Sequence, residues 1–542
     1  MKNKLVLCSM LLATLSTASL VGCGKKTGSQ DDPNKANLHV RTLNKGIGIT
    51  WLKNAAKMFE ELYAESDDFQ TGRKGVKIHV DGDTALSGEY LENNPLNDDV
   101  YFTEQIMYRD MVNKGKFLNI TDVLRTDLEY YGDPAGTTIE SKIDETMLNY
   151  LDVNGSYYGI PFYDSFYGLV YDVSLFKEEG LYLMSDGSFG FYDDPDISVG
   201  TDNIPGTPDD GLPATYEEFG TLLEELYNRN ITGFVTASNA KEYVADYLHN
   251  VYADYEGVDN MVMTLTLSGE ATDLADVDNS GNISYLEQTT ITPNNGYMLT
   301  KQVGRYKALT FLKNQLMGRN NYYRFVSTHT DAQSAFIKSK NSASAPAVAM
   351  IMEGSWWENE AATTIKNEAE RTGVATDYAI MPIPFESAEK AAACNYTHTY
   401  LSKSQSFGVV SANTSNPKLA KEFMRFVHCN KMLSKFTADT SITRPLNYEV
   451  TAADQSKLSN YAKSLIYLKG HSNIVYPYSS LQKEVNNPSY FKAYYFAWKA
   501  TVNGTPYMHP WDYFRNNPSN STPEKYFKGI YDCYYDAWPT LN

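Results

Sequence analysis

Apolar residues after residue 37 change their spacing from strand-like to helix-like. A short apolar run at 38–42 predicts a strand, and the residues after it recur at helical spacing, with Thr50 placed as a cap: Trp51, Ala55, Met58, Phe59 and Leu62. A second strand-like run covers residues 76–80. Strand, helix and strand in this order predict an α/β domain with a largely parallel sheet.

Two later helices have clear start signals. Thr215 and Glu218 form a capping box, and Pro417 takes the first position of another helix. Each is followed by one apolar face, made of Phe219, Leu222, Leu223 and Leu226 in the first helix and Leu419, Phe423, Phe426 and Val427 in the second. Between these helices the stretches 184–211 and 269–295 interrupt the pattern, and we expect both to be insertions.

The N-terminus has the layout of a secretory signal. Lys2 and Lys4 precede an apolar stretch that ends in Leu-Val-Gly-Cys at 20–23, which resembles the bacterial lipoprotein box. We therefore expect a signal peptide at 1–22, acylation of Cys23, and a location on the outer face of the cell membrane. The alternative is an ordinary signal peptide with an incidental cysteine. Residues 24–37 contain no Val, Ile, Leu, Met or aromatic residue, so segment 23–37 reads as a flexible tether.

The net charge of the chain excludes some classes of binding partner. Lys and Arg number 47 against 66 Asp and Glu, and loss of Lys2 and Lys4 with the signal lowers the net charge from −19 to −21. Such a chain repels nucleic acid, whose binding requires neutralised phosphates, and it repels anionic lipid. The acyl group is then the membrane attachment. The three remaining cysteines, Cys394, Cys429 and Cys533, form neither a disulfide framework nor a CxxC metal pair.

A series of short motifs resembles the family 1 extracellular solute-binding proteins, the group that includes maltodextrin-binding proteins. The motifs occur in the family's order and cover nearly all of the chain after the tether: Asp-Asp-Val-Tyr-Phe at 98–102, Gly-Lys-Phe-Leu-Asn-Ile-Thr at 115–121, Tyr-Gly-Ile-Pro at 158–161, Leu-Val-Tyr-Asp at 169–172 with Leu-Phe at 175–176, Pro-Ala-Thr-Tyr-Glu-Glu at 213–218, Ala-Met-Ile-Met-Glu-Gly-Ser-Trp-Trp at 349–357 and Ser-Phe-Gly-Val-Val at 406–410. The family's Pro before Asp99 is missing, and Tyr216 replaces its usual Trp.

The resemblance implies a two-lobe, periplasmic-binding-protein-like α/β fold of type II, with hinged lobes that each hold a mixed sheet flanked by helices. The N-terminal lobe would comprise 38–164 and 406–443, and the C-terminal lobe 165–405 and 444–542. It also implies a monomeric, non-enzymatic protein that captures a carbohydrate between the lobes, and we expect this carbohydrate to be an oligosaccharide. The partner implied is the permease of an ABC transporter.

Candidate ligand-binding residues follow from the positions of the motifs. Trp356 and Trp357 compete as the stacking platform, because an aromatic ring packs on the apolar C–H face of a pyranose. We expect one of the two to pack in the core. The further candidates are Tyr495, Tyr163, Asp164, Glu104 and Arg444. Their alternatives are a buried helix face for Tyr495, solvated loop positions for Asp164 and Glu104, and an ion pair with an acid at the hinge for Arg444, which we favour.

Residues 276–287 match the EF-hand calcium loop. Oxygen-bearing side chains stand at Asp276, Asp278, Ser280, Ser284 and Glu287, with Gly281 for the sharp turn and Asn282 beside it. We expect a structural Ca²⁺ here and no catalytic cofactor; the alternative is a solvated acidic turn. A second acidic run, Asp193, Asp194, Asp196, Asp202, Asp209 and Asp210, lacks this spacing and is expected to be a solvated loop.

The sequence is also compatible with three other functions. A peptide-binding lipoprotein of an ABC importer would have a similar length and the same anchor. A surface glycoside hydrolase needs two carboxylates across a sugar, which sequence alone does not exclude, although no HExxH, GxSxG, Walker A or dinucleotide glycine pattern occurs. A third class binds insoluble polysaccharide without an importer.

Overall fold

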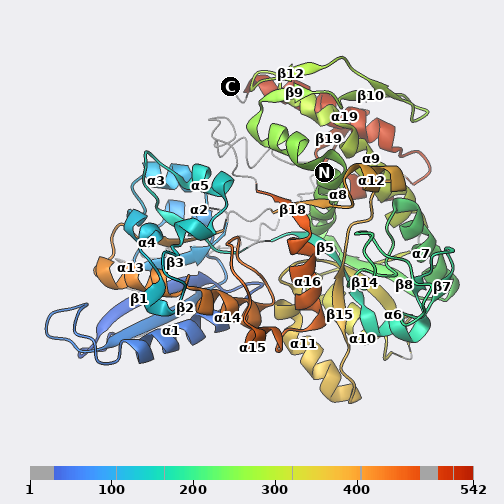
Figure 1. Cartoon of the computed structure of the whole chain (residues 1–542). Helices are drawn as coiled ribbons and strands as arrows, with labels where there is room; N and C mark the ends of the chain where they lie inside the picture. The colour runs from blue at the N-terminus through green and yellow to red at the C-terminus, as the bar shows by residue number, and fades with distance from the viewer. Residues whose placement is uncertain are drawn as a thin grey trace, which may run out of the picture.

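The computed structural model describes residues 30–540, apart from 105, 164, 320–321, 343, 403–405, 477–497 and 517 (Figure 1). The elements form two lobes, each built on its own five-stranded sheet. One apolar core is drawn from residues 36–163 and 407–442, and the other from residues 166–401 and 461–538. Among the described residues, the chain therefore passes from one core to the other between 163 and 166, between 401 and 407 and between 442 and 461. Leu446 still packs on the N-terminal core, beyond the boundary expected after 443.

The N-terminal lobe has the strand order β2-β1-β3-β17-β4. Its strands are β1 (Ala36–Leu43), β2 (Val76–Asp83), β3 (Val100–Thr103), β4 (Gly159–Pro161) and β17 (Phe407–Val410). β1 pairs in parallel with β2 and β3, whereas β17 runs antiparallel to β3 and β4, so the sheet is mixed. The helices of this lobe are α1 (Thr50–Leu62), α2 (Gly88–Asn93), α3 (Tyr108–Asn113), α4 (Thr121–Arg125), α5 (Glu145–Leu151), α13 (Pro417–Phe426) and α14 (Asn430–Thr440).

The C-terminal lobe has the strand order β13-β8-β14-β5-β15. Its strands are β5 (Tyr167–Asp172), β8 (Thr232–Ala237), β13 (Tyr323–Val326), β14 (Val348–Gly354) and β15 (Tyr378–Met381). Its longer helices are α6 (Val173–Glu179), α7 (Tyr216–Asn228), α8 (Lys241–Thr266), α9 (Val303–Phe311), α10 (His329–Ser339), α11 (Trp357–Thr372), α16 (Asn460–Gly470) and α19 (Pro523–Ala537). In the described part of the chain no helix has both the length and the apolar character needed to cross a bilayer.

Smaller elements connect and cover these sheets. They are β6 (Tyr182–Leu183), β7 (Phe189–Gly190), α12 (Ala388–Ala393), β16 (His398–Leu401), α15 (Ala452–Gln455), β18 (Ser472–Val475), β19 (Ala500–Val502), β20 (Thr505–Tyr507) and α18 (Pro510–Asn516). The expected insertion at 269–295 forms two short antiparallel pairs, β9 (Gly269–Ala271) with β12 (Thr289–Ile291) and β10 (Ala275–Val277) with β11 (Ile283–Tyr285).

Local start signals are mostly confirmed. The capping box between Thr215 and Glu218 is formed in both directions, and Pro417 opens α13 behind the Asn416 cap. The cap predicted at Thr50 is wrong, because Ile49 precedes the helix and gives no side-chain hydrogen bond. Thr50 is the first helical residue instead.

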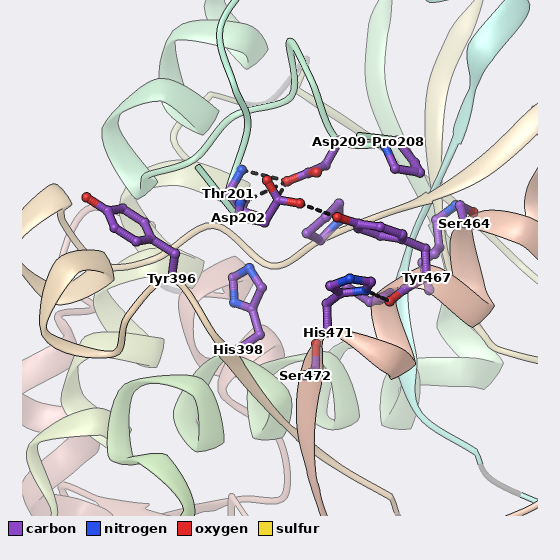
Figure 2. Close-up of a pocket in the computed structure, with 13 residues that line it drawn as sticks. Thr201, Asp202, Pro208, Asp209, Tyr396, His398, Ser464, Tyr467, His471 and Ser472 are labelled. Carbon is purple, nitrogen blue, oxygen red and sulfur yellow. Dashed lines mark hydrogen bonds between the residues drawn. The ribbon is translucent and has the colours of Figure 1, made fainter. Parts of the chain in front are cut away.

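The acidic run of the 184–211 insertion is not wholly solvated. Asp209 and Asp210 are buried, and Asp209 accepts hydrogen bonds from the Thr201 backbone N–H (2.7 Å) and hydroxyl (2.8 Å) (Figure 2). The solvated-loop prediction is therefore wrong for these two residues, because local N–H and hydroxyl donors replace the water that each carboxylate loses.

Candidate functional site

Three half-buried aromatic rings of the C-terminal lobe form one group. Trp356 stands between β14 and α11, Tyr167 begins β5, and Tyr243 lies in the first turn of α8. The Trp356 ring meets Tyr167 edge-on at a centroid distance of 5.3 Å and Tyr243 at 6.3 Å, while the two tyrosine rings are 5.2 Å apart. Rings that stay half-exposed and nearly perpendicular present both flat faces and polar tips to a ligand.

Trp356 also contacts the N-terminal lobe. Its side chain packs against the core of that lobe, and a Cβ added at Gly46 would come within 2.9 Å of its Cγ. Beside it, the Asn359 amide donates a 2.7 Å hydrogen bond to the Gly46 carbonyl. The tryptophan thus lies where the two lobes meet.

Glu104 approaches the same aromatic group from the other lobe. It follows β3 and accepts a 2.5 Å hydrogen bond from the Tyr163 hydroxyl. Burial raises the pKa of Glu104, and burial followed by the nearby Glu104 charge holds the pKa of Tyr163 well above its usual value. Burial is also the main reason that the pKa values of Tyr167 and Tyr243 are raised, and the Glu104 charge adds to both.

Polar residues that the sequence analysis missed complete the group. Glu353, near the end of β14, is 1% exposed, and burial, with a smaller effect of Glu360, raises its pKa to about 8. Gln333 donates to Glu353 at 3.2 Å and to Glu360 at 2.8 Å. Asp246, one turn after Tyr243 on α8, adds a further carboxylate whose charge acts on Tyr167 and Tyr243. Rings with carboxylates and an amide suit a ligand with apolar faces and many hydroxyls.

Trp357 is not part of this group. Its side chain is fully buried and contacts Phe336, Tyr378 and Tyr461 in the C-terminal core. Adjacent residues at the start of a helix point in different directions, so only one of the two tryptophans can face the other lobe. Its assignment as a ligand contact is therefore corrected.

Arg444 has no acidic partner in the part of the chain that the structure describes. Its guanidinium is fully buried in the N-terminal lobe, within 6 Å of the rings of Trp51, Phe102, Phe162 and Phe436. Among the described residues, its three guanidinium nitrogens have no hydrogen-bond partner, and burial lowers its pKa to about 9. The expected hinge ion pair is wrong, because cation–π contacts take the place of a carboxylate.

The EF-hand-like residues lie in the β10–β11 hairpin. Asp276 is opposite Ser284 and forms a 2.6 Å ion pair with Lys301, while Asp278 accepts from the backbone N–H groups of Ser280 and Asn282. The exposed Glu287 follows β11, where an EF-hand would continue as a helix. Among the described residues, Asp276, Asp278 and Glu287 do not bring three carboxylate oxygens within 4.8 Å of one another, and calcium binding stays a prediction.

Two hollows lie away from the aromatic group. The cavity in Figure 2, between the 184–211 insertion and α16, is about 20 Å³, which is room for a water molecule but not for a sugar. A groove of about 690 Å³ runs between segment 443–450 and α16. This groove is large enough for a sugar. We nevertheless favour the aromatic group as the site, because it combines aromatic rings with carboxyl groups from both lobes.

The remaining predicted residues lie outside the described part of the chain. These are Cys23, Asp164 and Tyr495. The described cysteines Cys394, Cys429 and Cys533 are free thiols.

Comparisons with known proteins agree on the fold. The sequence profile of the bacterial extracellular solute-binding proteins matches residues 55–428. The structure of RafE from Streptococcus pneumoniae in its apo form is similar at a TM-score of 0.55 and 14% identity, covering 93% of this chain and 98% of RafE. The GacH receptor of Streptomyces glaucescens, studied with acarbose, gives a TM-score of 0.56 and 12% identity, covering 93% and 99%. No curated protein matches the sequence significantly.

Proposed function

Because this chain belongs to the bacterial extracellular solute-binding protein family, we propose that it captures an oligosaccharide between its lobes and delivers it to an ABC transporter. The observation that carries the proposal is the half-buried Trp356, flanked by Tyr167 and Tyr243 and approached by Glu104 from the opposite lobe. RafE has been solved with raffinose, and GacH with acarbose; both have the same fold.

The chemistry of the group supports a sugar. The C–H face of a pyranose packs on the indole ring, while carboxylates and amides bond to its hydroxyls. A ligand that contacts both lobes stabilises the closed arrangement by its higher affinity for that state, so capture and lobe closure are one event. A ligand without matching hydroxyls takes water away from the polar side chains of this group and gives them no new hydrogen bond, which is the source of selectivity.

The anchor and the partner belong to the same proposal. Acylated Cys23 holds the protein on the outer face of the membrane through the segment ahead of β1, and the closed lobes dock on the permease subunits. The end of the tether expected at 37 is wrong, because Ala36 and Asn37 are buried in β1. Replacement of Cys23 by Ser is expected to abolish incorporation of labelled palmitate and to release the protein from membranes. Palmitate labelling that persists in C23S would overturn the anchor while leaving sugar binding untouched.

Calorimetric titration tests the ligand class. A panel of gluco-, galacto- and xylo-oligosaccharides is compared with a peptide library on the same protein, and each mixture is then examined for cleavage products. Saturable heat with one sugar class and no products is expected. Binding of peptides alone would favour the peptide-importer alternative, and products would favour a hydrolase. Sugar binding that survives Trp356→Ala unchanged would move the site to the groove at 443–450.

A further inference from the structure

Two buried histidines lie side by side on neighbouring strands of the N-terminal lobe. β1 and β2 pair in parallel with His39 opposite His79, so both side chains leave the same face of the sheet. Their rings stack at a centroid distance of 4.5 Å with an interplanar angle of 18°. They are 1% and 5% exposed, respectively. The two imidazole rings therefore lie side by side on one face of the sheet.

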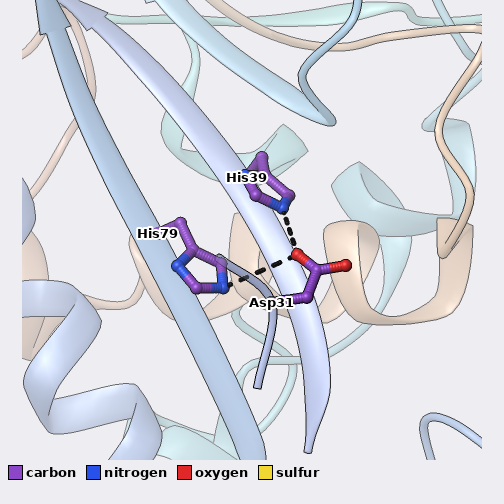
Figure 3. A group of neighbouring side chains, drawn as sticks. All are labelled: Asp31, His39 and His79. Carbon is purple, nitrogen blue, oxygen red and sulfur yellow. Dashed lines mark hydrogen bonds and ion pairs between the residues drawn. The ribbon is translucent and has the colours of Figure 1, made fainter. Parts of the chain in front are cut away.

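The segment ahead of β1 brings a carboxylate onto both rings. Asp31 Oδ1 lies 2.8 Å from His39 Nε2 and 3.9 Å from His79 Nε2 (Figure 3). The three possible ligand atoms lie within 4.8 Å of one another, and no other such group of His, Cys, Asp or Glu occurs among the described residues. Asn37, two residues before His39, places its amide oxygen 2.9 Å from His79 Nε2 and adds a fourth donor.

We propose that Asp31, His39 and His79 form a binding site for a transition-metal dication of the Zn²⁺ class. Two imidazole nitrogens and one carboxylate oxygen are a typical zinc donor set, with the fourth position left for water or for Asn37. Tetrahedral ligands at about 2.0–2.2 Å from zinc stand roughly 3.3 Å apart, so the two distances at Asp31 would change by about half an ångström. The stacked rings of His39 and His79 would also rotate, so that both Nε2 atoms point at the metal.

The surroundings of His39 suit a metal ligand. Its Nδ1 is buried without a hydrogen-bond partner among the described residues, and so is one carboxylate oxygen of Asp98, whose charge interacts with His39. A histidine that binds metal through Nε2 carries its proton on Nδ1, and carboxylates commonly hold that proton and fix the ring.

The site joins the N-terminal segment to the lobe. Asp31 precedes β1, and the metal would fix it on two strands of the central sheet. Asp31 already contacts His39 without a metal, and a bound ion would strengthen this attachment of the segment ahead of β1 to the sheet.

Titration of ZnCl₂ into the full-length protein tests the proposal. The protein is first freed of metal with a chelator, and excess Ca²⁺ is then added to occupy sites made only of oxygen. One equivalent is expected to bind, and Co²⁺ in its place is expected to give the visible absorption of a tetrahedral site. Asp31→Asn and His79→Gln are each expected to weaken Zn²⁺ binding tenfold or more.

A matched control lies one residue away. Asp32→Asn makes the same charge change, and Asp32 is outside the three-ligand group, so Zn²⁺ affinity is expected to stay unchanged. Because the Asp31 side chain is 54% exposed, D31N tests the site even if H79Q fails to fold. Unchanged Zn²⁺ stoichiometry and affinity in D31N would overturn the site. Sugar binding should be the same in all variants, which separates this outcome from a failure of the proposed function.

Discussion

At the scale of single residues, Trp356 and Trp357 are adjacent but have opposite surroundings, which gives a sharp test. Trp356→Ala is expected to lower oligosaccharide affinity by ~1–3 kcal/mol because a stacking ring is lost. Trp357→Ala is expected to lower the free energy of unfolding by ~3–5 kcal/mol because it empties the C-terminal core. Calorimetric titration and urea unfolding of both variants separate the two effects.

Each tryptophan variant serves as the other's control. The folded fraction of W357A should keep its sugar affinity, and W356A should unfold close to the wild-type midpoint. The reverse pattern would mean that Trp357 faces the ligand and that the placement of this pair is wrong.

The raised pKa of Glu353 predicts that the free energy of unfolding depends on pH. Its pKa is about 8 in the folded protein against an ordinary 4.5, so the native state binds a proton more tightly than the unfolded chain. The stabilisation is complete below about pH 4.5 and is lost as the pH rises towards 8, with a slope of at most about 1.4 kcal/mol per pH unit. Urea unfolding across this range should show the fall in wild type and a smaller one in Glu353→Gln. Equal slopes would contradict burial of an ionisable Glu353.

The sequence indicated which residue types the site needs but not which of them meet. The Trp356–Trp357 motif pointed to one interlobe ring, and Glu104 reaches the same aromatic group. Tyr243 and Asp246 lie in a long helix whose apolar residues give no sign that one face is turned to another lobe. The surroundings of Arg444 come from β3, the residue after β4, α1 and α14, so no local pattern predicts its four rings.

At the scale of elements, the loop between β1 and α1 supports the tryptophan. Gly46 has a φ of +52°, and a Cβ there would lie 2.9 Å from Trp356 Cγ. Gly72 has a φ of +76° with nothing within 4 Å. Alanine at either position costs ~1–2 kcal/mol of backbone strain. Only Gly46→Ala is expected to weaken sugar binding, because it displaces Trp356. Equal sugar affinities in the two variants would show that the loop does not position the ring.

The β10–β11 hairpin gives a test of calcium binding. Lys301 neutralises Asp276 and competes with any cation there. Lys301→Met is expected to raise Ca²⁺ affinity about two- to fivefold, the range of a partly exposed ion pair worth ~0.5–1 kcal/mol. Asp276→Asn should abolish binding. If calorimetry detects no Ca²⁺ binding in either wild type or K301M, the hairpin is an acidic turn without a metal.

Element types were more predictable than their ends. Periodicity and caps located β1, α1, α7 and α13, because these signals depend on residues only a few positions apart. The cap of α1 was misplaced by one residue, and the hairpin that holds Asp276 was not foreseen, because a calcium-loop spacing does not specify the strand pairing around it.

At the scale of the whole molecule, lobe closure predicts a change in shape. Small-angle scattering is expected to show a smaller radius of gyration when a binding sugar is added, because the ligand favours the arrangement in which both lobes contact it. In W356A the change should require a higher sugar concentration but reach the same end point. A radius that does not change at saturating sugar would show that binding occurs without closure.

The position of β17 also determines when the first lobe can be completed. This strand fills the gap between β3 and β4, although the entire sheet of the second lobe separates it from them along the chain. During synthesis from the N-terminus, β3 and β4 therefore lack the strand that pairs between them until residue 410 has been made. Such long-range pairing is slow, so the N-terminal lobe is expected to stay sensitive to proteolysis until β17 has been synthesised, long after its first four strands have been made.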